Sequence, residues 1–180
     1  MLKESRTALL CLLLLTLLTG VLYPLAVTLV GRVFFPRQAA GDLSLLGQPF
    51  DDPRYFWGRL SATTPGPYNA GSSAASNLGP SNPALTDSAR ARIAALRAAD
   101  PEQTGPVPID LVTSSASGLD PHISPAAASF QVGRVARLRG LDEAQVRALV
   151  KAHVTGPDLG LLGDPRVNVV ALNRALDAAR

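Results

Sequence analysis

The sequence predicts one N-terminal transmembrane helix followed by a mixed α/β (α+β) soluble domain, dominated by helices with a small sheet. Three observations support this fold class. Residues 7–31 contain no charged side chain, later segments repeat apolar residues at helical spacing, and short apolar runs between them suit strands. The 180 residues therefore divide into an N-terminal tail at 1–6, a transmembrane helix at 7–35 and a soluble domain at 36–180. That domain is long enough to bury a core of its own.

The apolar stretch 7–31 is long enough to cross a bilayer. About 25 helical residues rise roughly 37 Å, which exceeds a hydrocarbon core of about 30 Å. A cleaved signal peptide has a shorter apolar core and a small-residue cleavage site, which the sequence Tyr23-Pro24-Leu25 does not provide. Pro24 predicts a kink. Membrane lipid surrounds such a helix, and Thr16, Gly20 and Pro24 form a candidate packing surface for another helix, unless a lone span simply tolerates them.

Charge and cysteine content narrow the classes of partner. The formal net charge is +3 without a dense basic cluster, so we expect no nucleic-acid partner. Lys3 and Arg6 precede the apolar stretch while Arg32 and Arg37 follow it, which favours a cytoplasmic N-terminus only slightly. Cys11 is the only cysteine, so no disulfide forms within one chain.

The soluble part begins with a short connector at 37–47 and an aromatic segment at 48–60. Phe50, Tyr55, Phe56 and Trp57 are expected to pack in the core, with a docking surface as the alternative. Residues 61–83 are rich in Ser, Gly, Asn and Pro and show no periodicity, which predicts a long loop ordered by local hydrogen bonds.

Helix starts are marked by capping residues, two of them followed by proline, and helix ends by glycine or proline. We expect helices from Asn82-Pro83 to Ala99, from Ser124-Pro125 to Arg139, from Asp142 to before Gly156-Pro157, and over 172–179. Strands are expected at 107–113 and 167–170, with a second polar loop at 114–124. A solvated helical face is expected from the arginines Arg134, Arg137, Arg139 and Arg147.

Motifs for enzyme chemistry are missing from the sequence. It contains neither a phosphate-binding glycine loop that ends in Gly-Lys-Ser/Thr nor a Gly-x-Ser-x-Gly elbow. His122 and His153 lack metal-ligand spacing, so we expect no metal site and no catalytic residue. A local turn is the favoured interpretation of Asp120 and His122, although an enzyme would use these two residues with Ser124.

A binding or accessory module is therefore favoured over an enzyme. The polar loops on either side of the 83–113 helix–strand unit are the best surface for a ligand or a partner. The candidate nucleotide or partner-contact residues in and beside these loops are Asn69, Ser76, Asn77, Ser81, Asn82, Ser117, Asp120 and His122.

Several long stretches resemble one family along the whole chain. They are GQPFDDPRYFWGR at 47–59, SNLGPSNPAL at 76–85, VPIDLVTSSASGLDPHISPAAA at 107–128 and RVNVVALNRALD at 166–177. With these stretches the chain resembles the C subunit of the Kdp potassium-transporting P-type ATPase. Two departures stand out, a short segment at 41–46 and a leucine at 60 where the family often has proline. The first leaves open whether a strand hairpin follows the transmembrane helix.

The resemblance implies a non-catalytic accessory subunit of a high-affinity, ATP-driven potassium import complex in the inner membrane. Its partners would be an ATP-hydrolysing subunit and a potassium-translocating, channel-like subunit. The family is described as a catalytic chaperone that raises ATP binding by the hydrolysing subunit through a transient ternary complex, so no cofactor would be bound tightly. The absence of DKTGT and TVGYG motifs from the sequence agrees with a non-catalytic role.

The topology that the resemblance implies is a single pass with a cytoplasmic N-terminus and an extracytoplasmic domain. ATP is cytoplasmic, so such a domain could not touch it there. The alternative function is an extracytoplasmic cap that gates or stabilises the channel-like subunit without nucleotide contact.

Overall fold

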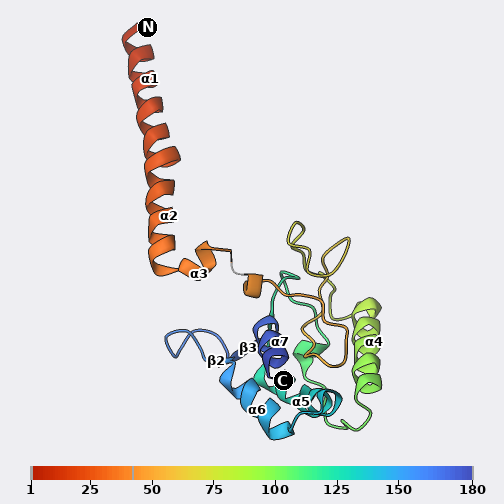
Figure 1. Ribbon diagram of the computed structural model, residues 1–180. Coiled ribbons are helices and arrows are strands. Elements are labelled where there is room, and N and C mark those ends of the chain that lie inside the picture. Colours follow the sequence, from red (N-terminus) through yellow and green to blue (C-terminus); the bar gives the residue numbers. More distant parts are fainter. Residues whose placement is uncertain (1, 42, 180) are drawn as a thin grey trace. The chain divides into compact units, whose positions relative to one another are not determined.

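A computed structural model describes residues 2–41 and 43–179 (Figure 1). It contains two compact units, Met1–Leu43 and Ser44–Arg180. The first unit is the predicted apolar helix, and the second is helix-rich with a small three-stranded sheet. The predicted fold class is therefore confirmed.

The first unit is one long helix interrupted by a π-helical turn. Helix α1 (Leu2–Leu17) continues through the π-turn (Leu18–Leu22) into α2 (Tyr23–Phe34), and the short α3 (Pro36–Ala39) follows. Within it, Lys3–Phe34 is long and apolar enough to span a membrane.

The irregularity predicted at Pro24 takes the form of this π-turn. The Tyr23 N–H donates to the Leu18 carbonyl, five residues back. This wider turn directly precedes Pro24, which has no N–H to donate and whose ring crowds an ordinary α-helical turn. The hydroxyls of Thr19 and Thr28 donate to the carbonyls of Leu15 and Pro24 at 2.7 Å, so both are satisfied within the helix.

The second unit contains four helices and a sheet in the part of the chain that the structure describes. The helices are α4 (Pro83–Ala99), α5 (Pro125–Arg139), α6 (Glu143–Ala152) and α7 (Val169–Ala178). The strands are β1 (His122–Ile123), β2 (Val154–Thr155) and β3 (Arg166–Asn168). The order is β1-β3-β2 and both pairs are antiparallel. In the central strand, Val167 faces Ile123 on one side and Val154 on the other.

The predicted helix caps are confirmed. The side chains of Asn82, Ser124 and Asp142 accept hydrogen bonds from backbone N–H groups in the first turns of α4, α5 and α6. Gly140 ends α5 with a φ of 65°, a left-handed conformation that suits glycine. A fourth cap was not foreseen: Asn168 accepts from the Ala171 N–H at 2.9 Å, so the last helix begins at Val169 rather than at 172.

Two strand predictions need correction. The strand predicted at 107–113 is wrong, because the segment instead forms a 3-10 turn over Ile109–Leu111. Pro106 and Pro108 have no N–H to give to a neighbouring strand. The strand predicted at 167–170 divides into the end of β3 and the start of α7, and β1 lies in what was predicted to be a loop.

The core of the second unit is built around α5. This helix packs against α6 and β3, and its Gln131 and Arg134 contact the aromatic segment, where Phe56 and Trp57 are buried as predicted. The solvated face predicted for four arginines is wrong for Arg134, which is 1% exposed. Its guanidinium hydrogen-bonds the Pro53 carbonyl and Gln131 and stacks on Trp57, with Cζ 4.8 Å from the ring centroid. Burial lowers the pKa of Arg134 to about 10.

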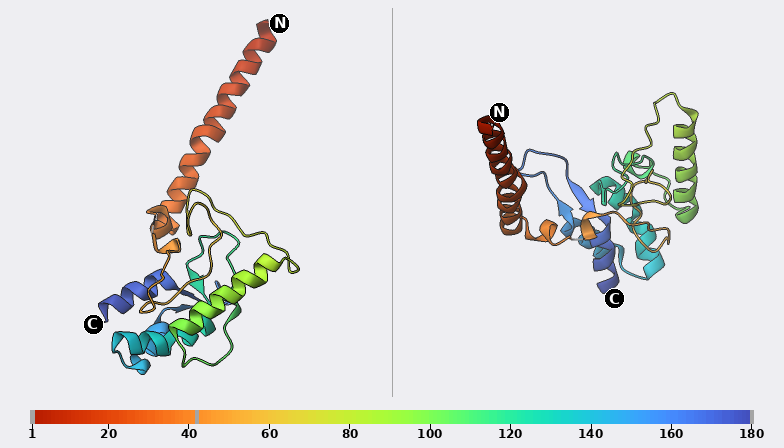
Figure 2. Two further views of the ribbon diagram at one scale, coloured as in Figure 1. Left: turned by 90° about the vertical axis from the view of Figure 1, so that its right-hand side faces the viewer. Right: turned by 90° about the horizontal axis from the view of Figure 1, so that it is seen from above.

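Helix α4 lies along the outside of the domain (Figure 2). Leu96 is its only fully buried residue among those described. Two arginines fasten it to the rest of the domain. Arg92 donates to the carbonyls of Leu111 and Gly58 at 3.2 and 3.0 Å. Arg97 donates to the Gly105 carbonyl at 2.6 Å. The attachment is therefore mostly polar.

Candidate functional site: a pair of joined loops

The two polar loops predicted as the contact surface are joined to each other. We call residues 60–80 and 114–121 together the loop pair. Leu60 and Ser114 form a parallel β-bridge, and the Ser115 N–H donates to the Leu60 carbonyl at 3.1 Å. Further along, the Ala74 N–H donates to the Ser117 carbonyl at 3.1 Å. Segments about 45 to 55 residues apart in sequence thus form one continuous surface.

Ser61 is the central hydrogen-bonding residue of the loop pair. Its hydroxyl donates to the Gly118 carbonyl at 2.7 Å and accepts from the Tyr68 N–H at 2.9 Å. Thr63 closes the neighbouring turn, donating to the Gly66 carbonyl at 2.7 Å and accepting from Asn69 N–H at 3.0 Å. The prediction of an ordered loop held by local hydrogen bonds is confirmed.

Tyr68 holds the aromatic segment against the loop pair. Its hydroxyl donates to the Arg59 carbonyl at 2.6 Å. The ring fits only because Gly47 and Gly58 lack side chains. A Cβ at Gly47 would overlap the ring, and one at Gly58 would lie 2.9 Å from the hydroxyl oxygen. Burial raises the pKa of Tyr68, so its hydroxyl remains a donor across the physiological range.

Asp120 organises the edge of the loop pair that faces β1. Its carboxylate accepts from the His122 N–H and the His122 ring Nδ1 at 3.0 Å, and from Arg59 Nη1 at 3.3 Å. Burial pushes the pKa of Asp120 upward, but the hydrogen bonds from His122 and the Arg59 charge outweigh it and bring the pKa below its ordinary value. The interpretation of Asp120 and His122 as a local turn network is confirmed.

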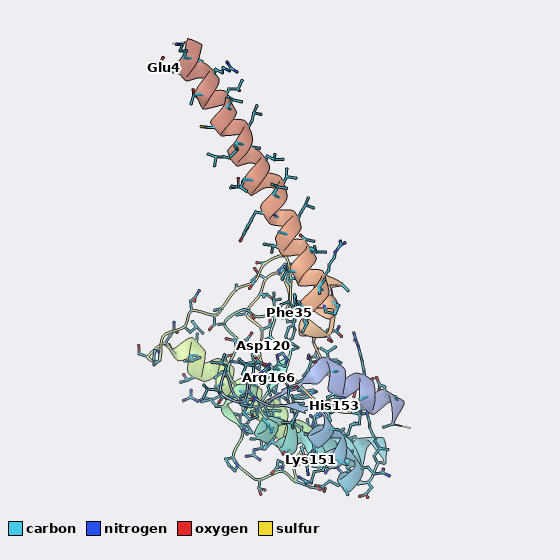
Figure 3. The ribbon with its side chains drawn as sticks, turned by 90° about the vertical axis from the view of Figure 1, so that its left-hand side faces the viewer. Glu4, Phe35, Asp120, Lys151, His153 and Arg166 are labelled. Atoms are coloured by element: carbon cyan, nitrogen blue, oxygen red, sulfur yellow. The ribbon has the colours of Figure 1, made fainter. Side chains whose placement is uncertain are left out.

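A shallow groove of about 490 Å³ runs from this network to the β2–β3 connection. Asp120 and Arg166, both labelled in Figure 3, lie on its walls, as does Asp110. Asp110 accepts from the Ser124 N–H and hydroxyl at 2.7 and 3.2 Å. Arg166 pairs with Asp158 at 3.2 Å. The charges of the groove are thus largely compensated from within the domain.

Sequence reasoning missed several residues of this groove, among them Arg59, Asp110 and Arg166. Arg59 lies near the end of the aromatic segment, and a charged residue beside so many aromatic ones could have marked it as a candidate site residue. Asp110 lies in the segment that was predicted to be a strand, and that prediction gave no reason to expect its carboxylate to contact Ser124. Arg166 gave no signal of its own.

The other predicted site residues divide into three groups. Asn69, Ser76 and Ser117 lie within the loop pair and make internal bonds: Asn69 to Thr64 and Gly71, Ser76 to Ser114, and Ser117 to the Leu119 N–H. Asn77, with a φ of 52°, and Ser81 are exposed. Asn82 serves the start of α4.

This arrangement is poorly suited to catalysis or to a nucleotide. The Ser124 hydroxyl is bonded to Asp110 and caps α5, while the His122 ring is bonded to Asp120, so the two show no nucleophile–base hydrogen bond. The amides and hydroxyls proposed for nucleotide contact are largely engaged with the backbone of their own loops. Among the described residues, no group of three or more His, Cys, Asp or Glu could hold a metal ion.

Comparison with known proteins gives matches along the whole chain. The family described as the c chain of the K+-transporting ATPase, KdpC, matches residues 5–178. A potassium-transporting ATPase KdpC subunit from Sorangium cellulosum is 60% identical across 100% of both chains. Another from Methylococcus capsulatus is 57% identical across 100% of both chains. One from Ralstonia nicotianae is 59% identical over 90% of this chain and 84% of its own.

Proposed function

The chain belongs to the KdpC family of K+-transporting ATPase c chains, and from this membership we propose that it is the non-catalytic accessory subunit of an ATP-driven potassium import complex. The observation that carries the proposal is the loop pair. It is an ordered polar surface whose side chains hydrogen-bond within the loops, so that it offers a fixed shape rather than free reactive groups. Loops held in place by a rigid scaffold commonly carry the binding residues of a protein. The catalytic and ion-conducting residues then belong to the partner subunits.

The proposed partners are an ATP-hydrolysing subunit and a channel-like, potassium-translocating subunit. The apolar helix Lys3–Phe34 lies in the inner membrane, with the N-terminus in the cytoplasm and the second unit outside it. In that orientation the loop pair can reach the extracytoplasmic face of the channel-like subunit. Thr16, Gly20 and Pro24 supply a face on which a membrane helix of a partner packs.

An effect on ATP binding is the finer part of the proposal. As a catalytic chaperone, the subunit raises the affinity of the hydrolysing subunit for ATP. The internal hydrogen bonds of Asn69, Ser76 and Ser117 favour an indirect effect, through stabilisation of the complex, over a transient ternary contact with the nucleotide. A photoreactive ATP analogue applied to the complex discriminates between the two, because saturable labelling of this chain requires direct contact.

A second candidate function is a cap over the extracytoplasmic mouth of the potassium pathway. Its support is the rigidity of the loop pair together with the charge compensation at the neighbouring groove. A reporter fused to the C-terminus establishes the topology on which the cap depends. A cytoplasmic C-terminus would exclude the cap and would allow direct nucleotide contact.

The decisive experiment blocks the loop pair without unfolding it. Gly79 is exposed, has open space around its Cα and does not have a positive φ, so Gly79→Arg adds a long charged side chain at low cost to folding. We expect this variant to lose co-purification with the other subunits and to abolish growth on low external potassium. Ala148→Arg, exposed on α6, is the matched control. Normal assembly of Gly79→Arg would contradict the proposed contact surface.

A further inference from the structure

The loop between β2 and β3 presents three leucines to solvent. Leu159, Leu161 and Leu162 are 95%, 84% and 59% exposed. We call residues 159–162 the leucine tip. Isolated exposed leucines are common on protein surfaces, but three within four residues form a contiguous apolar patch of the kind found at binding or membrane surfaces. Figures 1 and 2 show the tip as part of a loop that extends beyond β2 and β3.

The backbone of the leucine tip is ordered by its own hydrogen bonds. The Asp158 N–H donates to the Leu162 carbonyl at 2.8 Å, and the Leu162 N–H donates back to the Asp158 carbonyl at 2.9 Å. Gly160 and Gly163 adopt positive φ angles, and Leu159 does so as well, at 55°. A bulky side chain is unfavourable in that conformation, where glycine or asparagine would fit better. A leucine in such a position is consistent with a requirement for its exposed side chain.

The domain receives its membrane tether beside the base of this loop. The Ser44 carbonyl, at the start of the second unit, accepts a 2.6 Å hydrogen bond from Asn168 Nδ2. Asn168 lies two residues from Arg166 on β3, about 7 Å along a strand. A linker of about nine residues, 35–43, spans roughly 30 Å at most, and the helix Pro36–Ala39 shortens it. The loop that carries the leucine tip therefore leads into β3, the short strand to which the end of the membrane linker is hydrogen-bonded.

The composition of the tip favours lipid over protein as its occupant. Residues 159–163 are only leucine and glycine. They lack the Trp, Tyr and Arg that dominate the binding energy of protein interfaces, and leucine is under-represented among such hot-spot residues. Leucine is among the most favourable residues in hydrocarbon. Asp158 at the base is paired with Arg166, which lowers the cost of bringing that carboxylate near the bilayer.

We propose that the leucine tip inserts into the headgroup–acyl boundary of the bilayer that the helix Lys3–Phe34 crosses. This inference rests on the membrane anchoring in the proposed function. Insertion is shallow, because only one short loop is apolar and its flanking residues Asp158 and Asp164 stay at the surface. Zwitterionic lipid is sufficient, since the tip carries no basic residue that would select anionic headgroups.

The test uses the full chain in phosphatidylcholine vesicles, with one fluorescently labelled cysteine at a time and nitroxide-bearing lipids as quenchers. Native Cys11 lies within the apolar helix and reports anchoring. In a Cys11→Ser background, Leu161→Cys reports the tip, and Ala148→Cys, exposed on α6, is the matched control. We expect shallow nitroxides to quench the tip label at least about threefold more than the control, and deep nitroxides to quench it less than shallow ones.

The outcomes separate the two proposals. Quenching of the Cys11 label without quenching of the tip label would overturn lipid insertion and leave the anchored subunit intact. Loss of quenching at both sites would overturn anchoring and insertion together. The same measurement in the assembled complex tests whether a protein covers the tip instead. A tip label that lipid nitroxides do not quench in the complex, because the other subunits cover it, would also overturn the proposal.

Discussion

The side-chain amide of Asn173 is paired with the main chain of Phe56, accepting from its N–H and donating to its carbonyl at 3.0 Å each. The side-chain amide of Gln131 likewise accepts from the Trp57 N–H at 2.8 Å and donates to the Trp57 carbonyl at 3.1 Å. All four residues are buried. Two amide side chains, from α7 and α5, thus supply the hydrogen bonds that a neighbouring strand would otherwise provide to the aromatic segment.

Asn173→Ala should therefore lower the free energy of unfolding by about 2–4 kcal/mol, because it leaves the buried N–H and the buried carbonyl of Phe56 without hydrogen-bond partners. The measurement is denaturant unfolding of the detergent-solubilised chain followed by the emission of Trp57, the only tryptophan. Arg174→Ala, exposed on the same helix, is the control and should change stability little. Equal midpoints for the two variants would contradict the role of the amide.

Gly47→Ala should destabilise the chain by about 1–3 kcal/mol, because the added Cβ overlaps the Tyr68 ring and forces the ring out of its place. Thermal unfolding provides the measurement. Gly66→Ala is matched to it, since Gly66 lies in the loop pair and an added methyl there would meet nothing within 4 Å. A Gly47→Ala variant as stable as Gly66→Ala would show that Tyr68 does not occupy this slot.

Ser61→Ala should loosen the loop pair locally, since one hydroxyl joins Gly118 to Tyr68. We expect a loss of about 1–2 kcal/mol. Amide hydrogen exchange should accelerate at Tyr68 while the amides of α5 remain protected. Exchange that accelerates across the whole domain, or nowhere, would not fit a local role. Ser88→Ala, exposed on α4, serves for comparison.

Acid should weaken the network around Asp120. The pKa of this carboxylate is below its ordinary value in the folded chain, so the stability that it contributes is present above the unfolded pKa of about 3.9 and is lost as the pH falls through the folded value. Asp120→Asn should therefore lower the unfolding midpoint at pH 7, and the difference from the unsubstituted chain should shrink below about pH 4. A difference that stays constant from pH 7 to pH 3 would rule out this ionisation.

Gly20→Leu should weaken assembly rather than folding. A Cβ at Gly20 lies 3.9 Å from the Thr16 methyl, so the helix itself accepts a side chain there, whereas a partner helix on that face would be displaced. We expect co-purification with the other subunits to fall about tenfold, which corresponds to about 1.4 kcal/mol. Val21→Leu enlarges a neighbouring face and should assemble normally. Undiminished co-purification of Gly20→Leu would argue against packing at this face.

Local signals in the sequence were sufficient for much of the fold. Caps at Asn82, Ser124 and Asp142 act within one helical turn, so their residue types alone predicted where α4, α5 and α6 begin. The apolar span and the burial of Phe56 and Trp57 follow from composition in the same way.

The features that sequence reasoning missed depend on distant partners. Strand β1 has two residues and exists because β3 lies beside it, far along the chain. Arg134 looked like one of several solvated arginines, but the Pro53 carbonyl and the Trp57 ring give it buried partners. The site was predicted as two separate loops, and hydrogen bonds between them, such as those of Ser61 and Ala74 to the second loop, make it one surface. No local pattern encodes such pairings.

The polar attachment of α4 has a consequence for how the domain opens. A helix that hides little apolar surface can separate as a unit once the carbonyl contacts of Arg92 and Arg97 break, and the opening would uncover the core at Leu96 and beside Trp57. Such an opening of α4 would carry with it the end of the polar loop at Ser81. A partner that binds α4 could in this way change the conformation of the adjoining loop pair while the rest of the domain stays folded.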